Sequence, residues 1–307
     1  MSTPRFLTLP RCARAVRVAT ERGGFAALRA EPAGAVRGSA LLVPGFTGSK
    51  EDFIALLEPL AAAGYRLTAV DQRGQYETGG PDDPAAYAVD ALGADVRALT
   101  RALAAEAADG GPLHLVGHSF GGQVVREAVL AAAAEGPLPW ASLTLMSTGA
   151  GAIDPAEAAR TQLLLDALPV LSLEEIWQVM RQMEEGSGDP RQRPADEVAA
   201  FLHRRWLASV PRALAVTGGH LVAAPDRVDA LAAATAGLPV LVLSGVRDYA
   251  WPVPAQTDMA RRLGARRVIV EDAGHSPNAE RPAETAGALA AFWAGAGTSA
   301  PASADVV

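Results

Sequence analysis

A sharp corner between a strand and a helix is encoded at Gly117-His118-Ser119-Phe120-Gly121. An apolar run at 113–116 precedes this corner, and a stretch with the period of a helix begins at Phe120. A chain that turns so abruptly leaves its corner residue in strained backbone, and glycines two positions before and after remove Cβ atoms that would collide. The pattern therefore predicts that the Ser119 side chain projects outward.

The corner is one of several strand and helix signals that alternate along the chain. The runs 15–18 and 25–28 flank Arg22-Gly23-Gly24, a pattern typical of a hairpin. Further buried-strand runs lie at 39–43, 66–70, 113–116, 143–146, 239–243 and 267–270. Helical periods lie between these runs at 53–63, 91–108, 120–134 and 254–263, and a last one follows them at 280–294. Repeated strand and helix units predict an α/β fold, with a mostly parallel sheet of about eight strands flanked by helices.

The alternation stops between 154 and 225, where helical periods dominate and no buried-strand run occurs. Leu173, Ile176, Trp177 and Met180 follow the spacing of one helix face, and Val198, Phe201, Leu202 and Trp206 follow that of a second. The polar stretch 184–194 between them predicts a linker that could act as a hinge. These signals predict a core formed by 1–153 and 226–296, an inserted helical cap at 154–225, and a flexible tail at 297–307.

Charge and cysteine content limit the possible partners. Lys and Arg total 27 against 34 Asp and Glu, a net charge of −7, and no basic cluster is dense enough to follow a nucleic-acid backbone. The single cysteine, Cys12, cannot form an internal disulfide, and no spacing typical of a metal site or of a nucleotide-binding loop occurs. The N-terminal stretch 1–17 lacks the apolar centre of a secretory signal, and charge, glycine or proline interrupts every long apolar run. We therefore expect a cytoplasmic protein without a metal, cofactor, nucleic-acid or membrane partner.

Four segments of the chain resemble the α/β-hydrolase family. They are Gly-His-Ser-Phe-Gly-Gly at 117–122, Pro-Gly-Phe-Thr-Gly at 44–48, Asp248 within Gly-Val-Arg-Asp-Tyr, and Ala-Gly-His-Ser-Pro at 273–277. The likeness covers roughly 14–296. It implies a serine hydrolase with a nucleophile elbow and a helical cap, in which Ser119 is the nucleophile, Asp248 the acid and His275 the base.

The residue types themselves indicate the same partners. A serine hydroxyl is a weak nucleophile that needs a base, and the base needs a group that holds its tautomer. Of the five histidines, at 114, 118, 203, 220 and 275, only His275 follows a plausible acid at a strand end. His114 and His118 are predicted to be core or packing residues, and His203 and His220 to have surface or packing roles. Asp248 follows the 239–243 run and is the preferred acid, with Asp154 as the alternative. Since all three residues follow strands of a parallel sheet, one edge can gather them.

Two backbone N–H groups are expected to form an oxyanion hole. Phe120, directly after the nucleophile, supplies the first, and the resemblance places the second at Phe46 in the loop after the 39–43 strand. Pro44 stands where many members of the family have histidine. Phe46 keeps its own N–H, so this departure removes only the hydrogen bonds that the histidine would have made to the loop.

Apolar and aromatic side chains predict an apolar substrate. The expected substrate-binding residues are Phe46, Trp177, Met180, Phe201, Trp206, Tyr249 and Trp251. Met183 is a further apolar side chain expected at this pocket. The leading hypothesis is hydrolysis of a small to medium apolar carboxylic ester, lactone or thioester through an acyl-enzyme. A carbon-carbon bond hydrolase or an acyltransferase could use the same residues, because fold and triad do not determine the substrate. A ligand-binding relative that does not catalyse a reaction is the alternative from another class.

Overall fold

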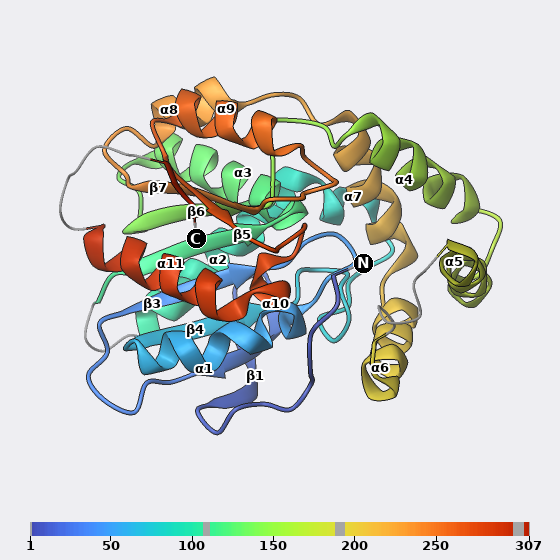
Figure 1. The fold of residues 1–307 in the computed structure, drawn as a ribbon, viewed down its shortest axis with the longest axis horizontal. Coiled ribbons are helices and arrows are strands. Elements are labelled where there is room, and N and C mark those ends of the chain that lie inside the picture. Colours follow the sequence, from blue (N-terminus) through green and yellow to red (C-terminus); the bar gives the residue numbers. More distant parts are fainter. Residues whose placement is uncertain (1, 107–110, 188–193, 297–303, 307) are drawn as a thin grey trace.

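The computed structural model describes residues 2–106, 111–187, 194–296 and 304–306. Within these ranges nine strands form one sheet in the order β1-β2-β4-β3-β5-β6-β7-β8-β9 (Figure 1). β1 (Ala13–Thr20) and β2 (Gly23–Ala30) form the predicted antiparallel hairpin, and β2 is also antiparallel to β4. The other neighbouring pairs are parallel, so the predicted α/β fold with a mostly parallel sheet is confirmed.

The central strands are apolar because helices cover both of their faces. The strands after the hairpin are β3 (Gly38–Val43), β4 (Tyr65–Val70), β5 (Leu113–His118), β6 (Ser142–Met146), β7 (Val240–Gly245), β8 (Arg266–Val270) and β9 (Ala304–Val306). Every residue of β5, β6 and β7 is buried. Parallel strands covered on both sides need this continuous apolar character, which explains why the runs do not alternate.

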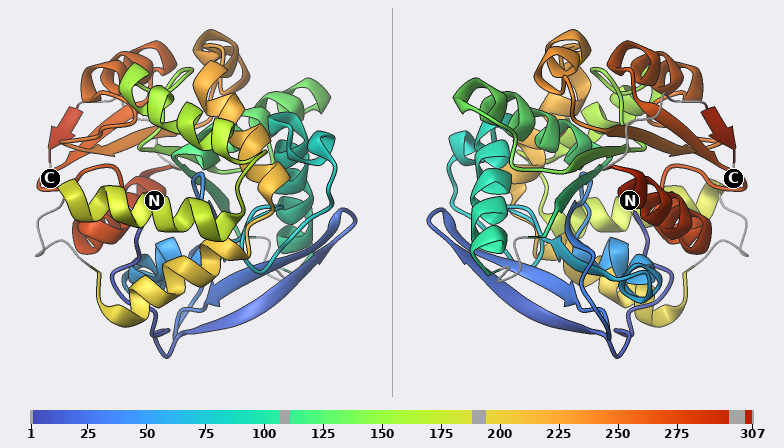
Figure 2. Two further views of the ribbon diagram at one scale, coloured as in Figure 1. Left: turned by 90° about the vertical axis from the view of Figure 1, so that its right-hand side faces the viewer. Right: turned by 90° about the vertical axis from the view of Figure 1, so that its left-hand side faces the viewer.

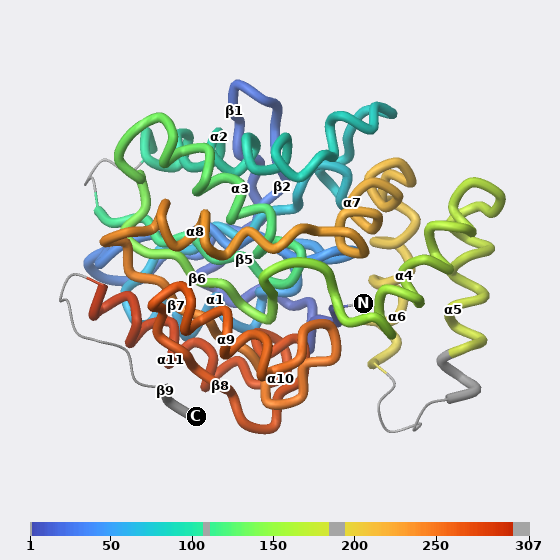
Figure 3. Tube along the Cα trace, turned by 90° about the horizontal axis from the view of Figure 1, so that it is seen from above, coloured from blue at the N-terminus to red at the C-terminus, as the bar shows by residue number. Residues whose placement is uncertain are grey.

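Two helical layers enclose the sheet. One face packs against α2 (Val89–Glu106), α3 (Phe120–Glu135), α8 (Val228–Ala234) and α9 (Val253–Leu263). The other face packs against α1 (Ile54–Ala62) and α11 (Pro282–Gly295), with the short α10 (Pro277–Glu280) beside α1. Figure 3 shows α2 and α3 on the side of the sheet opposite α11. The short 3₁₀ helices η1 (Lys50–Phe53) and η2 (Pro84–Tyr87) lie in the loops after β3 and β4.

Four helices occupy the predicted insertion between β6 and β7, and we refer to them as the inserted helices. They are α4 (Pro155–Ala167), α5 (Leu173–Ser187), α6 (Asp196–Leu207) and α7 (Pro211–Ala223). α4, α5 and α6 lie together at one end of the molecule, and the N-terminus lies among them (Figures 1 and 2). None of the helices described here has both the length and the apolar composition that crossing a membrane requires.

Three predicted segments fall partly outside the described residues. α5 continues to Ser187, so the stretch predicted as a linker at 184–194 begins inside a helix, and 188–193 lie outside the described residues. Residues 107 and 108, the predicted end of the helix that begins at Val89, also lie outside them. Of the predicted tail at 297–307, only 304–306 are described. They form β9, a short strand parallel to β8 that the sequence did not predict.

A buried ion pair joins the inserted helices to the rest of the fold. Arg205 of α6 donates from Nη1 to Asp52 Oδ1 at 2.7 Å, and their side chains are 1% and 0% exposed. Its other terminal nitrogen donates to the carbonyl of Ser2 at 2.6 Å, so the same guanidinium also holds the N-terminal segment. Asp52 lies in η1, directly after the loop that follows β3.

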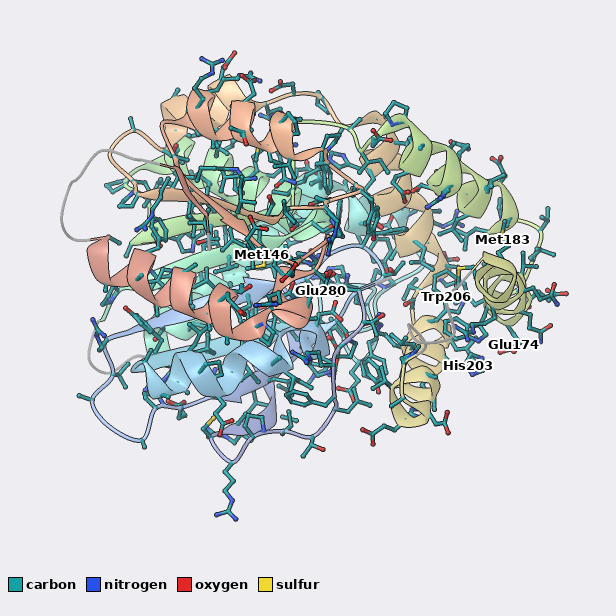
Figure 4. The ribbon with its side chains drawn as sticks, viewed as in Figure 1. Met146, Glu174, Met183, His203, Trp206 and Glu280 are labelled. Carbon is teal, nitrogen blue, oxygen red and sulfur yellow. The ribbon has the colours of Figure 1, made fainter. Side chains whose placement is uncertain are left out.

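Polar contacts also hold α6 against α5. His203 Nε2 and Glu174 Oε2 are 2.6 Å apart, and both residues are labelled in Figure 4. The indole N–H of Trp206 donates to the carbonyl of Leu173 at 2.7 Å. These two contacts join the first residues of α5 to α6.

We expect Arg205→Met to lower the free energy of unfolding by about 3–5 kcal/mol, because it leaves the Asp52 carboxylate buried without its cation. Arg204→Met is the matched control: Arg204 is the exposed neighbour on the same helix, and its loss should change stability by about 0.5 kcal/mol or less. Denaturant titrations of both variants measure the difference. Equal stability of the two variants would show that the buried pair does not hold the inserted helices in place.

Candidate active site

Ser119 occupies the corner between β5 and α3 in strained backbone, with φ 56° and ψ −124°. Non-glycine residues seldom adopt this conformation. The backbone packs closely around the corner: a Cβ on Gly117 would lie 2.4 Å from the carbonyl oxygen of Gly121, and a Cβ on Gly121 would lie 2.4 Å from that of Val43. The predicted need for glycine at both positions is thus confirmed.

The structure brings together the three residues predicted as nucleophile, base and acid. Ser119 follows β5, Asp248 follows β7 and His275 follows β8, all at the same edge of the sheet. Ser119 Oγ lies 3.0 Å from His275 Nε2, and His275 Nδ1 lies 2.9 Å from Asp248 Oδ1. Since an ionised carboxylate only accepts hydrogen bonds, Nδ1 carries the proton and Nε2 is free to accept the Ser119 hydroxyl.

Asp248 is held as an ion by its hydrogen bonds. Burial by itself would raise its pKa, but the hydrogen bond from His275, together with those from the N–H groups of Trp251 and Ala250, lowers the pKa of this carboxyl below its usual value. Its second oxygen accepts from Gln256 Nε2 at 2.9 Å. The carboxylate of the alternative acid, Asp154, instead caps α4, where it accepts the N–H of Ala156 at 2.9 Å.

His118 forms a hydrogen bond with the backbone of His275. Its Nε2 lies 2.9 Å from the carbonyl oxygen of His275, which can only accept, so Nε2 is the protonated nitrogen. Burial lowers the pKa of His118 to about 4, so this ring is neutral at physiological pH. The predicted packing role of His118 therefore includes a hydrogen bond to the loop that carries His275. His114 is a core residue as predicted, with Nδ1 2.8 Å from Ser142 Oγ.

The two expected oxyanion donors lie beside Ser119. Phe120 is the first residue of α3, where a helix leaves its N–H groups without intrahelical partners. Phe46 belongs to the loop after β3, and this loop lines the same cavity as Ser119. Within the described part of the chain, neither N–H donates to a backbone acceptor. Both N–H groups therefore remain candidate donors to an oxyanion.

A cavity of about 670 Å³ opens next to Ser119 and His275. Among the residues predicted to bind substrate, Phe46, Met180, Trp206, Tyr249 and Trp251 line it. The ring of Tyr249 lies 4.9 Å from the ring of His275, and Trp251 is 6.2 Å from it on the same loop. The wall is mainly apolar, with Glu157 and Arg160 of α4 as its charged members.

Two predicted substrate-binding residues, Trp177 and Phe201, do not line this cavity. Trp177 stacks on the imidazole of His203, 5.1 Å away, and Phe201 packs edge-on against Tyr76 at 5.5 Å. Consecutive helical residues point about 100° apart, so Trp177 faces α6 when its neighbour Ile176 faces the cavity. Both side chains join the inserted helices to each other and to the core.

Several cavity residues escaped the sequence prediction. Ile176 and Val179 of α5 line the wall together with Met180, and so do Leu163, Leu164 and Ala167 of α4. Met183 of α5, which was expected at an apolar pocket, lines it as well. Met183 and Trp206 are labelled in Figure 4. Leu163 and Met183 are each 62% exposed although they are apolar. The only sequence signal for the cavity side of α5 is helical spacing, which Ile176, Val179, Met180 and Met183 share.

No group of three or more His, Cys, Asp or Glu side chains that could hold a metal ion occurs among the residues that the structure describes. The polar atoms around Ser119 instead belong to the serine, the two imidazoles, the carboxylate and backbone N–H groups. This set is suited to proton transfer and to stabilisation of a developing negative charge.

Comparison with known proteins supports this picture. The sequence profile of the alpha/beta hydrolase family matches residues 40–288. A search of curated protein sequences found no significant match.

Solved structures with the same fold have different activities. A thermophilic esterase from Thermogutta terrifontis is 23% identical, with a TM-score of 0.71 over 93% of this chain and 100% of that one. The enol-lactonase from Burkholderia xenovorans LB400 is 18% identical, with a TM-score of 0.70 over 91% and 100%. An epoxide hydrolase from an endophytic Streptomyces is 22% identical, with a TM-score of 0.68 over 97% and 100%.

These TM-scores establish a shared fold, which by itself does not determine the reaction. The family profile, in contrast, covers most of the sequence, including the loop that carries Phe46, the Ser119 corner, Asp248 and His275. This chain therefore belongs to the alpha/beta hydrolase family.

Proposed function

We propose that this protein is a serine hydrolase that cleaves an apolar carboxylic ester, lactone or thioester through an acyl-enzyme. One observation carries the proposal: Ser119 Oγ lies 3.0 Å from His275 Nε2, at the base of an apolar cavity. An epoxide hydrolase of this fold needs a carboxylate nucleophile, and this chain has serine at the corner.

The first half of the reaction forms the acyl-enzyme. As Ser119 Oγ attacks the carbonyl carbon, His275 Nε2 takes its proton, and the ionised Asp248 stabilises the resulting imidazolium. The N–H groups of Phe46 and Phe120 donate to the oxyanion, and each such donor is worth about 10²–10³ in rate. His275 then returns the proton to the leaving oxygen or sulfur.

The second half repeats these steps with water as the nucleophile. His275 takes a proton from water, the hydroxide attacks the acyl carbon, and Ser119 leaves with the proton from His275. The acid product then departs through the cavity. An alcohol or amine in place of water would make the protein an acyltransferase with the same residues, and a carbon leaving group would make it a carbon-carbon bond hydrolase.

The shape of the cavity supports a substrate with an apolar chain. Its wall continues from Phe46 and Trp251 near Ser119 to Leu163 and Met183, which are largely exposed at its outer end. Contacts along such a wall increase with each methylene of the substrate. We propose that residues 154–225 act as a cap that forms this wall, above a core formed by 1–153 and 226–296.

Ser119→Ala should reduce the turnover of an activated aryl ester at least about 10⁴-fold, because no hydroxyl remains to attack. The unaltered protein should show a burst of one product equivalent and should be labelled at Ser119 by a fluorophosphonate. A ligand-binding relative would bind the ester without a burst. Turnover that persists in the variant would exclude the acyl-enzyme route.

Acidification should reduce kcat/KM with the slope of a single proton, since a protonated imidazole at His275 cannot accept the Ser119 proton. Asp248, with its lowered pKa, and His118, with a pKa of about 4, keep their charge states between pH 5 and 8 and add no second proton there. Rates measured across this interval provide the test. A flat profile would contradict the role of His275.

A series of straight-chain aryl esters should gain up to about fourfold in kcat/KM for each added methylene, the equivalent of about 0.8 kcal/mol of apolar burial. Leu163→Asp should flatten this series, because it places a charge on the cavity wall. Val170→Asp is the control: Val170 is 77% exposed and does not line the cavity. If kcat/KM rises with ester length equally in both variants, the alkyl chain of the substrate does not lie along this wall.

A further inference from the structure

The loop that carries Phe46 has little regular structure to hold it. Thr47 has a positive φ of 57°, and the one hydrogen bond between backbone groups of the loop 44–48 runs from the N–H of Gly48 to the carbonyl of Gly45 at 3.1 Å. The loop nevertheless sits tightly against the nucleophile, since a Cβ on Gly45 would lie 2.8 Å from Ser119 Cβ. A donor on such a loop needs support from neighbouring side chains.

Two glutamines from the segment after β4 supply hydrogen bonds to this loop. Gln75 Nε2 donates to the carbonyl of Gly45 at 2.8 Å, and Gln72 Nε2 donates to the carbonyl of Pro44 at 2.8 Å. Gln72 is 6% exposed, and Gln75 is half-buried. The acyl-enzyme route described above gives neither side chain a role.

The position of the Gly45 carbonyl bears directly on Phe46. The C=O of Gly45 and the N–H of Phe46 are the two ends of one planar, trans peptide unit, and they point in opposite directions. A donor that fixes the oxygen therefore fixes the direction of the N–H. It also polarises the unit, since hydrogen bonds in a chain strengthen one another.

The glutamine side chains are themselves held in place. Gln75 Oε1 accepts the N–H of Gln72 at 2.9 Å, so the amide of Gln75 cannot rotate without losing a bond. Asp71, which directly precedes Gln72, accepts the N–H of Lys50 at 2.8 Å and a hydrogen bond from the Lys50 ammonium at 3.0 Å. The segment after β4 is thereby attached to the far end of the loop and forms a fixed support for it.

We propose that Gln75, aided by Gln72, is a positioning residue that aims the Phe46 N–H at the oxyanion. The proposal rests on the proposed function, because it assigns a support to one of its two donors. Gln75 is not among the residues that line the cavity next to Ser119. It acts through a single peptide unit, so its removal affects the transition state more than the bound substrate.

Gln75→Glu separates the two hydrogen bonds of this side chain, the one it accepts from the N–H of Gln72 and the one it donates to the carbonyl of Gly45. It keeps nearly the same volume and an oxygen for the N–H of Gln72, but it removes the side-chain donor to Gly45 and leaves that carbonyl with the N–H of Gly48. Gln75→Met removes both. We expect each variant to lose about 10- to 100-fold in kcat on an aryl ester, as expected when a donor is misplaced, with KM changed by less than about threefold.

Inhibitors provide a readout that a merely structural role would not change. Ser119 Oγ adds to the carbonyl carbon of a trifluoromethyl ketone and passes its proton to His275, and the adduct carries an oxyanion. The affinity for this ketone should therefore fall by the same factor as kcat/KM. The secondary alcohol with the same carbon skeleton carries no oxyanion, and its affinity should change by less than about threefold.

Gln123→Met is the matched control. Gln123 on α3 is also a buried glutamine, and its Nε2 donates to the carbonyl of Gly151 at 2.8 Å, away from the Phe46 loop. Its loss should lower thermal stability without changing kcat by more than about threefold. This variant shows how much any buried amide contributes through stability alone.

The outcomes are distinguishable. Wild-type kcat in Gln75→Glu, or equal loss of affinity for the ketone and the alcohol, would overturn the role of Gln75 and leave the proposed function intact. Absence of turnover by Ser119 in the unaltered protein would overturn both.

Discussion

The strained backbone of Ser119 is the constraint on which the candidate site depends. A positive φ at a residue with a side chain persists only when its surroundings determine it more strongly than its own preference. Here the N–H of Ser119 donates to the carbonyl of Met146 on the neighbouring β6, and the carbonyl of Ser119 accepts from Gly122 in the first turn of α3. The parallel sheet and the helix together hold the hydroxyl toward His275, and the glycines around it allow this approach.

A second set of polar contacts connects the site to the inserted helices. Asp52 accepts from Arg205 of α6 through its side chain, and its carbonyl accepts from Asn278, three residues after His275. η1, α6 and the short helix α10 just after His275 therefore meet at one buried residue, Asp52. A buried ion pair gives little net stability but strongly disfavours arrangements that separate its partners. This pair defines where α6 stands relative to Ser119.

Much of this arrangement follows from local patterns. Short apolar runs between helical periods predicted the parallel sheet, and Gly117 and Gly121 around Ser119 predicted the corner. The placement of His275 and Asp248 after strands predicted that they would meet Ser119. The wall of the cavity was harder to predict, because 173, 176, 177 and 180 and the overlapping set 176, 179, 180 and 183 are both good helix faces. Only the packing of α5 against α6 decides that Trp177 turns toward His203 and Val179 toward the cavity.

By itself, the sequence determined the class of the fold, the corner at Ser119 and the identity of its two partners, because these depend on backbone preference and on the order of elements along the chain. The tertiary structure alone decided which face of α5 lines the cavity, which cation meets Asp52 and which amides hold the loop of Phe46. Those contacts join residues such as Gln75 and Gly45, or Arg205 and Asp52, that are distant in the chain. No local periodicity encodes such pairs, since they arise only when separate elements pack together.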